Sequence, residues 1–171
     1  HPENIELALK VCIELGVNKD TALQGMLKTN PDPGALFVWD ISYENNKNKF
    51  VSAFAANDPN STMKVWGLIS SNYEGKKCIF LNTRNDRRYR TIQLIDLVLH
   101  HIRPDVFIVR ADEIDSIINN YDRDNIKIIN YAMSISPKII IEEINKLDNH
   151  IIVGVGNMVG WGGEFIQKIK R

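Results

Sequence analysis

KKCIFLNTRNDRRYRTIQLIDLVLHHI, residues 76–102, joins three kinds of sequence that together decide the fold class. The first part is a short apolar run, which is typical of a strand buried on both faces. The last part, residues 91–102, repeats its apolar residues with the spacing of an amphipathic helix. Between them lies a polar loop with four arginines and one aspartate, residues 81–91. The stretch therefore predicts a buried strand, an arginine-rich loop and a helix.

The same alternation continues on both sides of this stretch. Residues 35–43 and 49–55 are predicted to be strands, and the polar loop between them favours a hairpin. Apolar runs predict further strands, and amphipathic segments predict further helices. The strands are at 105–111, 126–130 and 150–157, and the helices are at 59–73, 113–121, 137–147 and 164–171. Such alternation predicts an α/β fold, a mostly parallel sheet with helices on both faces.

The first part of the chain has a different character. Residues 2–16 are so densely apolar that they predict a mostly buried helix, and residues 21–28 predict a second helix capped by Asn18 or Asp20. The breaker NPDPG, residues 30–34, follows this pair. The chain also begins inside a helical pattern without Met, as expected of a fragment of a longer protein. We therefore expect a helical segment at 1–30 and an α/β domain at 31–171.

Composition limits the classes of function. Lys and Arg number 21 and Asp and Glu also number 21, so the net charge is near zero. Because nucleic-acid binders usually carry a basic excess over a whole face, no nucleic-acid partner is predicted. No apolar run approaches the roughly 20 residues needed to cross a bilayer. Cys12 and Cys78 match no metal-ligand spacing, so buried thiols are expected and no metal site is predicted in this chain.

Three loops are the candidate ligand-binding rim, because ligands of parallel α/β sheets bind outside the carboxyl ends of the strands. These loops follow Phe54, Leu81 and Val155. In the second loop, guanidinium groups can bind a carboxylate or phosphate through paired hydrogen bonds, and the helix N-terminus adds partial positive charge. Asp86 can orient one arginine there. A solvated loop or a structural Arg–Asp network would also explain the cluster.

Not every arginine of the cluster can face one ligand, and Arg88 and Tyr89 are the expected bystanders. In the first loop, Asp58 precedes a proline in the pattern of a helix N-cap, and capping alone would explain it. The functional interpretation places Asp58 at a ribose hydroxyl or a cation. The third loop, GVGNMVGWGG at 154–163, opens like a dinucleotide-binding loop, but Val159 replaces its third glycine. A dinucleotide cofactor is therefore disfavoured, and close ligand approach and plain turn geometry both stay open.

Four segments together resemble a known family. They are NPDPGAL (30–36), FVSAFAANDPNST (50–62), IFLNTRNDRRYRT (79–91) and IIVGVGN (151–157). In this order and spacing they resemble the Mur-ligase-like subunit of poly-γ-glutamate synthases, which are capsule-forming amide ligases. The resemblance covers nearly the whole chain and is weakest between residues 110 and 149. It implies that 1–30 close a central ATPase domain and that 31–171 form a Rossmann-like C-terminal ligase domain.

The resemblance also implies a chemistry. Mur-type ligases use ATP and Mg²⁺ to phosphorylate a carboxylate, and the amine of an incoming amino acid attacks the acyl phosphate. By this likeness the full-length protein polymerises glutamate into poly-γ-glutamate, with the ATP and Mg²⁺ site mostly in the upstream domain. The partners implied are glutamate, poly-γ-glutamate and the membrane subunits of a synthase complex at the cytoplasmic face of the membrane. An N-terminal membrane anchor would lie outside this chain, and a homo-oligomer stays open.

The likeness assigns roles to motif residues. The resemblance implies nucleotide contacts for Asn57 and Asp58, a phosphate contact for Arg90, and catalytic roles for Asp58 and Arg87. Substrate contacts are implied for the arginine loop and the closing glycine loop, namely Asn82, Arg84, Asp86, Arg87, Thr91, Gly156 and Asn157, with Gly154 matching the same glycine motif. Within this set, we expect Arg84 and Arg87 to hold a carboxylate of glutamate or of the growing chain.

Two departures from the family pattern affect these expectations. The phosphate loop GxxxxGK[ST] is absent from this sequence, so the chain alone is expected to lack ligase activity. No arginine follows Pro33-Gly34, where residues 36–38 are Leu, Phe and Val, so one nucleotide contact is missing or supplied elsewhere. Two alternatives stay open: another Mur-type ligase, acting on folylpolyglutamate or a peptidoglycan precursor, and a non-catalytic anion-binding α/β module.

Overall fold

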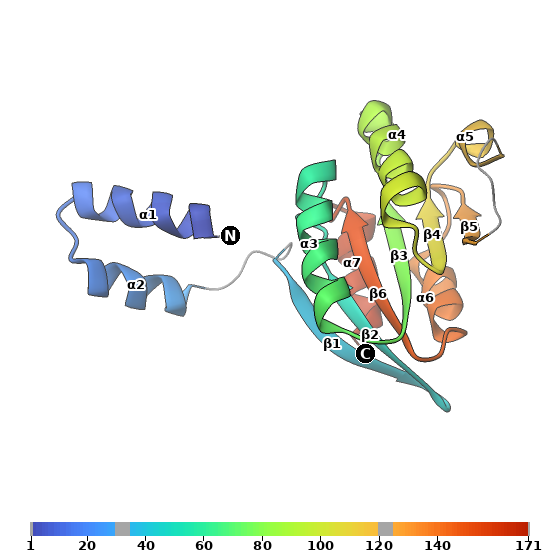
Figure 1. The fold of residues 1–171 in the computed structure, drawn as a ribbon, viewed down its shortest axis with the longest axis horizontal. Helices are drawn as coiled ribbons and strands as arrows, with labels where there is room; N and C mark the ends of the chain where they lie inside the picture. Colours follow the sequence, from blue (N-terminus) through green and yellow to red (C-terminus); the bar gives the residue numbers. More distant parts are fainter. Residues whose placement is uncertain (1, 30–34, 120–124, 171) are drawn as a thin grey trace. The chain divides into compact units, whose positions relative to one another are not determined.

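The computed structural model describes residues 2–29, 35–119 and 125–170. The chain divides into two compact units, residues 1–32 and 33–171 (Figure 1). The predicted breaker at 30–34, with Pro33-Gly34, lies outside the described residues.

The first unit is a pair of helices, α1 (Pro2–Glu14) and α2 (Lys19–Lys28). Both helices were expected from the spacing of their apolar residues. Asn18 caps α2, because its Oδ1 accepts hydrogen bonds from the N–H groups of Asp20 at 2.8 Å and Thr21 at 3.4 Å. Of the two candidate caps in the sequence, the first is therefore the one used.

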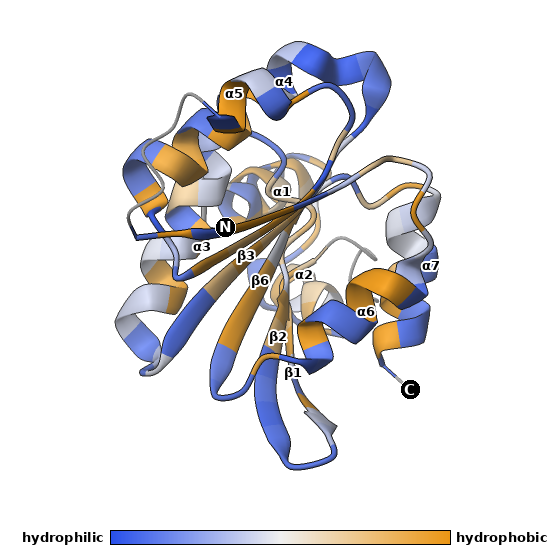
Figure 2. Ribbon diagram, turned by 90° about the vertical axis from the view of Figure 1, so that its right-hand side faces the viewer, coloured by the Kyte–Doolittle hydropathy of each residue, from blue (hydrophilic) through white to orange (hydrophobic). Residues whose placement is uncertain are grey.

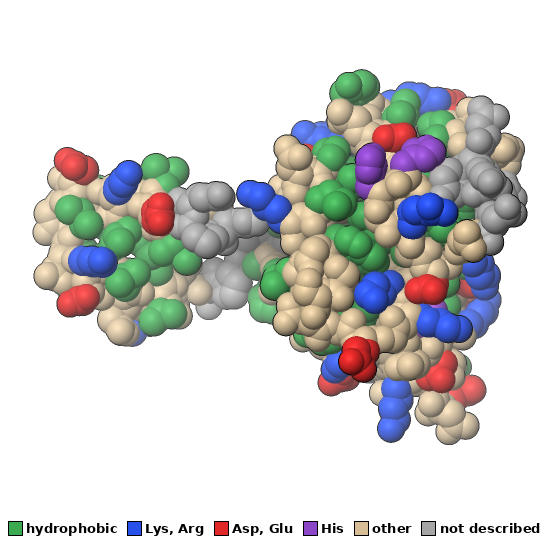
Figure 3. Space-filling view, viewed as in Figure 1, with side chains coloured by type: hydrophobic (Ala, Val, Ile, Leu, Met, Phe, Trp, Pro, Cys, Tyr) green, Lys and Arg blue, Asp and Glu red, His purple; other side chains and the backbone are tan. Residues whose placement is uncertain are grey.

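The prediction that the first helix is mostly buried is wrong for the described unit. Leu7 is 65% exposed and Leu15 is 77% exposed, and Ala22 is the one buried residue among residues 4–29. Figure 3 shows hydrophobic side chains at the surface of this unit. Apolar residues surround much of α1, and the single neighbouring helix can cover just one side of it. Cys12 is half-buried for the same reason.

The second unit contains a six-stranded sheet in the order β1-β2-β6-β3-β4-β5. Its strands are β1 (Phe37–Tyr43), β2 (Asn46–Ser52), β3 (Lys76–Asn82), β4 (Val106–Arg110), β5 (Lys127–Tyr131) and β6 (His150–Gly156). The first two strands form the predicted antiparallel hairpin, and every other neighbouring pair is parallel. The mostly parallel, Rossmann-like α/β sheet predicted from the sequence is confirmed.

Helices cover both faces of the sheet, as the alternating pattern predicted. They are α3 (Pro59–Asn72), α4 (Arg88–Leu97), α5 (Asp115–Asn119), α6 (Pro137–Asn145) and α7 (Trp161–Ile169). A 3₁₀ turn, η1 (Asn85–Arg87), precedes α4, and a π-helical turn, η2 (Val98–Ile102), follows it. α3, α4 and α5 pack on one face, whereas α6 and α7 pack on the other (Figure 1).

The central strands are buried on both sides because successive side chains point to opposite faces. In β3, Ile79 and Leu81 join the core beneath α3 and α4, whereas Cys78 and Phe80 join the core beneath α6 and α7. In Figure 2 the ribbons of β3 and β6 are largely in the hydrophobic colour, whereas the helices mix hydrophobic and hydrophilic residues. The thiol of Cys78 is fully buried, and burial raises its pKa far above the usual range, so it is a packing group.

The strand order positions the candidate site. β6 lies between β2 and β3 and runs parallel to both, so the carboxyl ends of these three strands are neighbours. The loops predicted to form the ligand rim follow these same three strands. Segments that are distant in the sequence, after residues 52, 82 and 156, therefore meet at one edge of the sheet.

Candidate functional site

A cleft lies where these three loops meet. It encloses about 330 Å³ of atom-free space that opens to solvent. Its lining comes from the loop after β2, the end of β3 with the start of α4, and the end of β6. The lining residues are Asn57, Leu81, Asn82, Thr83, Arg84, Arg87, Arg90, Thr91, Leu94, Gly156 and Asn157. Every predicted site residue lines the cleft except Asp58, Asp86 and the motif residue Gly154.

The charge of the lining has one sign. Arg84, Arg87 and Arg90 contribute three guanidinium groups, and none of the described lining residues is a carboxylate. Guanidinium groups bind carboxylates and phosphates through paired N–H donors. The α4 N-terminus, at the same place, adds partial positive charge. The cleft is therefore suited to an anionic ligand.

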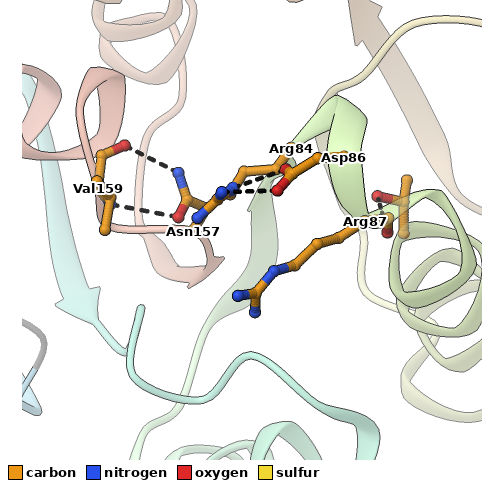
Figure 4. A network of polar contacts seen from close by, with 6 residues as sticks. Arg84, Asp86, Arg87, Asn157 and Val159 are labelled. Atoms are coloured by element: carbon orange, nitrogen blue, oxygen red, sulfur yellow. Dashed lines mark hydrogen bonds and ion pairs between the residues drawn. The ribbon is translucent and has the colours of Figure 1, made fainter.

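Arg84 is held by Asp86. The Arg84 Nε and Nη2 atoms donate to the two carboxylate oxygens of Asp86 at 2.8 and 2.7 Å (Figure 4). These hydrogen bonds lower the pKa of the Asp86 carboxyl and raise the pKa of the guanidinium. Because both side chains are exposed, the pair adds little to stability, and its effect is to orient Arg84. The expected ion pair between Asp86 and one arginine is confirmed.

Arg87 has a different environment. Within the described part of the chain, no hydrogen bond or ion pair engages its guanidinium, and its carbonyl accepts from the Thr91 hydroxyl at 3.4 Å. Figure 4 shows the side chain extending away from the helix that carries it, with no dashed line at its guanidinium. Its five N–H donors therefore remain available to a ligand.

Arg90 connects α4 with the loop after β2. Its Nη1 donates to Oδ1 of Asn57 at 3.1 Å, which fixes two of the predicted nucleotide-facing residues against each other. Its charge also helps to lower the pKa of Asp58, although the larger cause is the hydrogen bond from Ser61. Both residues line the cleft, Arg90 from α4 and Asn57 from the loop after β2.

Asp58 is the N-cap of α3. Its carboxylate accepts from the Ser61 N–H at 3.1 Å and from the Ser61 hydroxyl at 2.6 Å, and Pro59 begins the helix. The sequence left capping and ligand contact open, and the structure supplies the capping contacts. Asp58 does not line the cleft, so a contact with a nucleotide stays a prediction.

The glycine-containing loop after β6 packs closely against Asn82 at the end of β3. Gly156 has φ +98°, and a Cβ atom at this position would lie 2.3 Å from the carbonyl oxygen of Asn82. Next to it, the Asn157 N–H donates to the same carbonyl at 2.7 Å. The glycine is therefore needed both for its backbone conformation and for this close approach. Turn geometry, one of the two open interpretations, accounts for it.

The expected bystanders lie outside the cleft. Arg88 Nη1 makes an ion pair with Glu113 at 2.8 Å, and Tyr89 is 76% exposed. Neither residue is part of the lining. Among the described residues, no group of three or more His, Cys, Asp or Glu is placed to hold a metal ion.

Arg110 is the residue that sequence reasoning missed. It ends β4, is 6% exposed, and donates from Nη1 to Oδ1 of Asn82 at 3.0 Å. One feature of the sequence pointed to a role for Arg110, namely its position at the end of the apolar run DVFIVRA. A cation inside a buried strand needs polar partners. Burial lowers its pKa below the ordinary arginine value.

A family model described as the poly-gamma-glutamate synthase CapB C-terminal domain matches residues 38–171. This match covers all of the sheet except Phe37, the first residue of β1, and all three loops of the cleft. The chain belongs to this family. The C-terminal ligase domain implied by the sequence motifs agrees with this membership.

Two curated relatives support the same conclusion. The chain is 32% identical to the PGA synthase CapB of Bacillus subtilis (strain 168) over 173 residues, which cover 98% of the chain and 44% of that protein. It is also 32% identical to the capsule biosynthesis protein CapB of Bacillus anthracis, covering 98% of the chain and 37% of that protein. The chain thus spans less than half the length of these CapB relatives.

Solved structures support the fold. MurF from Acinetobacter baumannii matches 92% of the chain with a TM-score of 0.61 and 10% identity, over 35% of its own length. The MurF ligase from Thermotoga maritima, solved in complex with ADP, matches 95% of the chain with a TM-score of 0.58 and 13% identity, over 36% of its length. These likenesses confirm the Mur-ligase-like fold class. No helix in residues 2–29, 35–119 or 125–170 is long and apolar enough to span a membrane.

Proposed function

We propose that this chain is the C-terminal part of an ATP-dependent amide ligase that extends poly-γ-glutamate. Membership of the CapB C-terminal domain family supports the substrate class. The observation that carries the proposal is the cleft at the carboxyl ends of adjacent strands, which presents three arginines and, among the residues described, no lining carboxylate. Glutamate and its γ-linked polymer are carboxylate-rich, so this lining matches their chemistry.

The three arginines have different proposed roles, and the contacts of each one decide which. Arg87 binds a carboxylate of glutamate or of the growing chain, because its donors have no protein partner among the described residues. Arg84 assists from a fixed orientation, since Asp86 holds two of its donors. Arg90, braced by Asn57, faces a phosphate. Rigid positioning of this kind is a large part of catalysis in reactions that join two bound substrates.

ATP supplies the activation of the carboxylate, and its site with Mg²⁺ lies mostly in the upstream part of the protein. The residues of this chain fit a supporting role there, because Arg90 and Asn57 offer polar groups to a phosphate. The described residues offer no carboxylate cluster to a metal ion. The membrane subunits of a synthase complex are the proposed partners, at the cytoplasmic face of the membrane. The names of the CapB relatives support a place in capsule or polymer synthesis.

The test measures glutamate-dependent ADP release by the full-length protein and by two variants. Arg87→Ala removes the unpaired guanidinium, and we expect kcat/KM for glutamate to fall by about 10- to 100-fold, the range for losing a charged hydrogen bond. Arg88→Ala is the matched control, because Arg88 is the adjacent arginine but pairs with Glu113 outside the cleft. Unchanged turnover in a folded Arg87→Ala variant would remove the site assignment.

Substrate competition separates this proposal from other Mur-type ligases. Stimulation of ADP release by folate or a nucleotide-sugar peptide, without stimulation by poly-γ-glutamate, would favour those ligases. Reading the parent gene upstream tests the non-catalytic alternative, because a ligase needs a phosphate loop of the form GxxxxGK[ST] there. Absence of this phosphate loop from the parent gene would favour the non-catalytic anion-binding module.

A further inference from the structure

Arg110 is a buried cation at the base of the two loops that form one side of the cleft. Its guanidinium contacts three separate segments. Nη1 donates to Asn82 at the end of β3, Nη2 donates to the Met133 carbonyl after β5, and the group lies 4.4 Å from the ring centroid of Trp161 in α7. Its Nε has no hydrogen-bond partner among the described residues. Within the described part of the chain, no carboxylate lies at ion-pair distance from Arg110, and the charge of Asp112 only partly offsets the lowering of its pKa by burial.

A buried guanidinium without an ion pair is costly, so its retention requires a reason. Packing alone would be served better by a neutral side chain of similar size. What a guanidinium adds is a set of donors with no acceptor. It can therefore face just one end of an amide side chain, the oxygen.

This one-sided chemistry fixes the orientation of Asn82. With Oδ1 directed to Arg110 at 3.0 Å, Nδ2 must point the other way, and it donates to the Asn157 carbonyl at 2.6 Å. A flipped amide would place Nδ2 against the cation and Oδ1 against a carbonyl, and both contacts would be repulsive. Arg110 thus sets the direction of the hydrogen bond between Asn82 and Asn157, although Arg110 itself is not part of that bond.

The consequence reaches the lining of the cleft. Asn82, Gly156 and Asn157 are lining residues, whereas Arg110 is not. The junction has no spare room, since a Cβ atom on Gly162 would lie 2.5 Å from the Asn157 carbonyl. Because a flipped Asn82 amide would set its Oδ1 against the Asn157 carbonyl oxygen, their repulsion would displace the loop after β6.

We propose that Arg110 is a positioning residue that locks the Asn82 amide and so holds the Asn157 loop in its ligand-binding position. Arg110 acts through Asn82 and touches no ligand. The link from loop position to ligand affinity rests on the proposed function, whereas the link from Arg110 to loop order does not.

The first test is hydrogen exchange in the full-length protein, followed in the segment at 156–160 and in β3 and β4. In Arg110→Met we expect exchange of the loop segment to rise about tenfold, the effect of losing one charged hydrogen bond, with the strands unchanged. Arg88→Met is the matched control, since its ion pair with Glu113 lies outside the junction, and its loop exchange stays at the wild-type rate. Unchanged loop exchange in Arg110→Met, or equal acceleration in the strands, would overturn the proposal.

The Asn82→Asp variant tests the proposal even if Arg110→Met does not fold. It keeps and strengthens the contact with Arg110 but removes the Nδ2 donor to Asn157. The proposal therefore requires faster loop exchange in this variant as well. Loop exchange at the wild-type rate would show that no relay through the amide exists.

The second test is a double-mutant cycle on the KM for glutamate. Arg110→Met and Asn82→Ala are each expected to raise KM about tenfold with little change in kcat, and the double variant is expected to match the single variants. A product of the two effects, about 100-fold, would mean independent roles and would reject the relay. Absence of any glutamate-dependent turnover in the wild-type protein would reject the proposed function, while the exchange experiment would still decide the role of Arg110.

Discussion

Asn82 and Asn157 are joined by two hydrogen bonds of opposite direction. The Asn157 N–H donates to the Asn82 carbonyl at 2.7 Å, and the Asn82 Nδ2 donates to the Asn157 carbonyl at 2.6 Å. Asn82 ends β3 and Asn157 directly follows β6. The two residues are 75 positions apart in the sequence, and their strands are neighbours in the sheet. The pairing extends the sheet register beyond the strands and joins two of the three loops of the cleft into one rigid wall.

This wall depends on Gly156, and the first prediction concerns that residue. Gly156→Ala is expected to destabilise the protein by about 1–3 kcal/mol through its left-handed φ alone. The clash of the new Cβ with the Asn82 carbonyl adds to that cost. Thermal unfolding measures the effect, and ligand affinity should fall as well because the wall shifts.

Gly67→Ala is the matched control for this substitution. Gly67 lies within α3, and a Cβ atom there meets nothing within 4 Å. Because alanine is the better helix former, this variant is expected to stabilise the protein by about 0.5–1 kcal/mol. Equal unfolding temperatures for the two variants would contradict the close approach at Gly156.

The second prediction concerns acid stability and Asp58. Asp58→Ala removes the α3 cap and is expected to cost about 1 kcal/mol at neutral pH. The hydrogen bond from Ser61 lowers the pKa of Asp58 in the folded protein. The stabilisation is therefore fully present above the ordinary aspartate pKa and is lost as the pH falls through the lowered value.

Asp58→Asn serves as the comparison, because asparagine caps helices well but does not titrate. The stability difference between wild type and Asp58→Asn should shrink as the pH is lowered from about 5 to about 2, measured by chemical denaturation. A difference that stays constant over this range would show that the Asp58 carboxylate gains nothing from its contacts with Ser61.

Much of this architecture could be predicted from the sequence, for identifiable reasons. Apolar strands such as residues 78–81 are buried on both faces, so their pattern is unambiguous, and the loops that follow parallel strands must share one edge. The motif around Arg84 and Arg87 therefore placed the cleft correctly. The arrangement of the arginines was not predictable, since Arg84 and Arg88 have the same chemistry and differ just in the acid within reach.

The failures have physical causes too. The density of apolar residues in α1 predicts burial, but burial depends on what covers a helix, and this is not encoded locally. Arg110 escaped notice because a lone cation in an apolar run looks like a strand end. The role of Arg110 depends on its contacts with Asn82, Met133 and Trp161, and the pattern of a strand does not predict that these residues lie together. Asp58 showed two compatible interpretations because a cap and a ligand contact use the same side-chain oxygen.

The third prediction concerns the orientation of Arg84. Asp86→Asn weakens the two charged hydrogen bonds that hold the guanidinium and should raise the KM for glutamate by about threefold, because the exposed pair is worth little energy. The effect should be smaller than that of Arg87→Ala. A fall in KM would instead show that Asp86 competes with the ligand for Arg84, which would contradict the orienting role.

The last prediction separates the charge of Arg87 from its geometry. Arg87→Lys keeps the positive charge but replaces a planar fork of donors with a single ammonium group. If Arg87 binds a carboxylate through paired hydrogen bonds, kcat/KM for glutamate should fall about tenfold in the lysine variant and further in Arg87→Ala. Raising the salt concentration should weaken ligand binding in the wild type and in the lysine variant, and much less in the alanine variant, because screening acts on the charge that remains. Full activity of Arg87→Lys would show that Arg87 supplies charge alone, and the paired contact with the carboxylate would then be wrong.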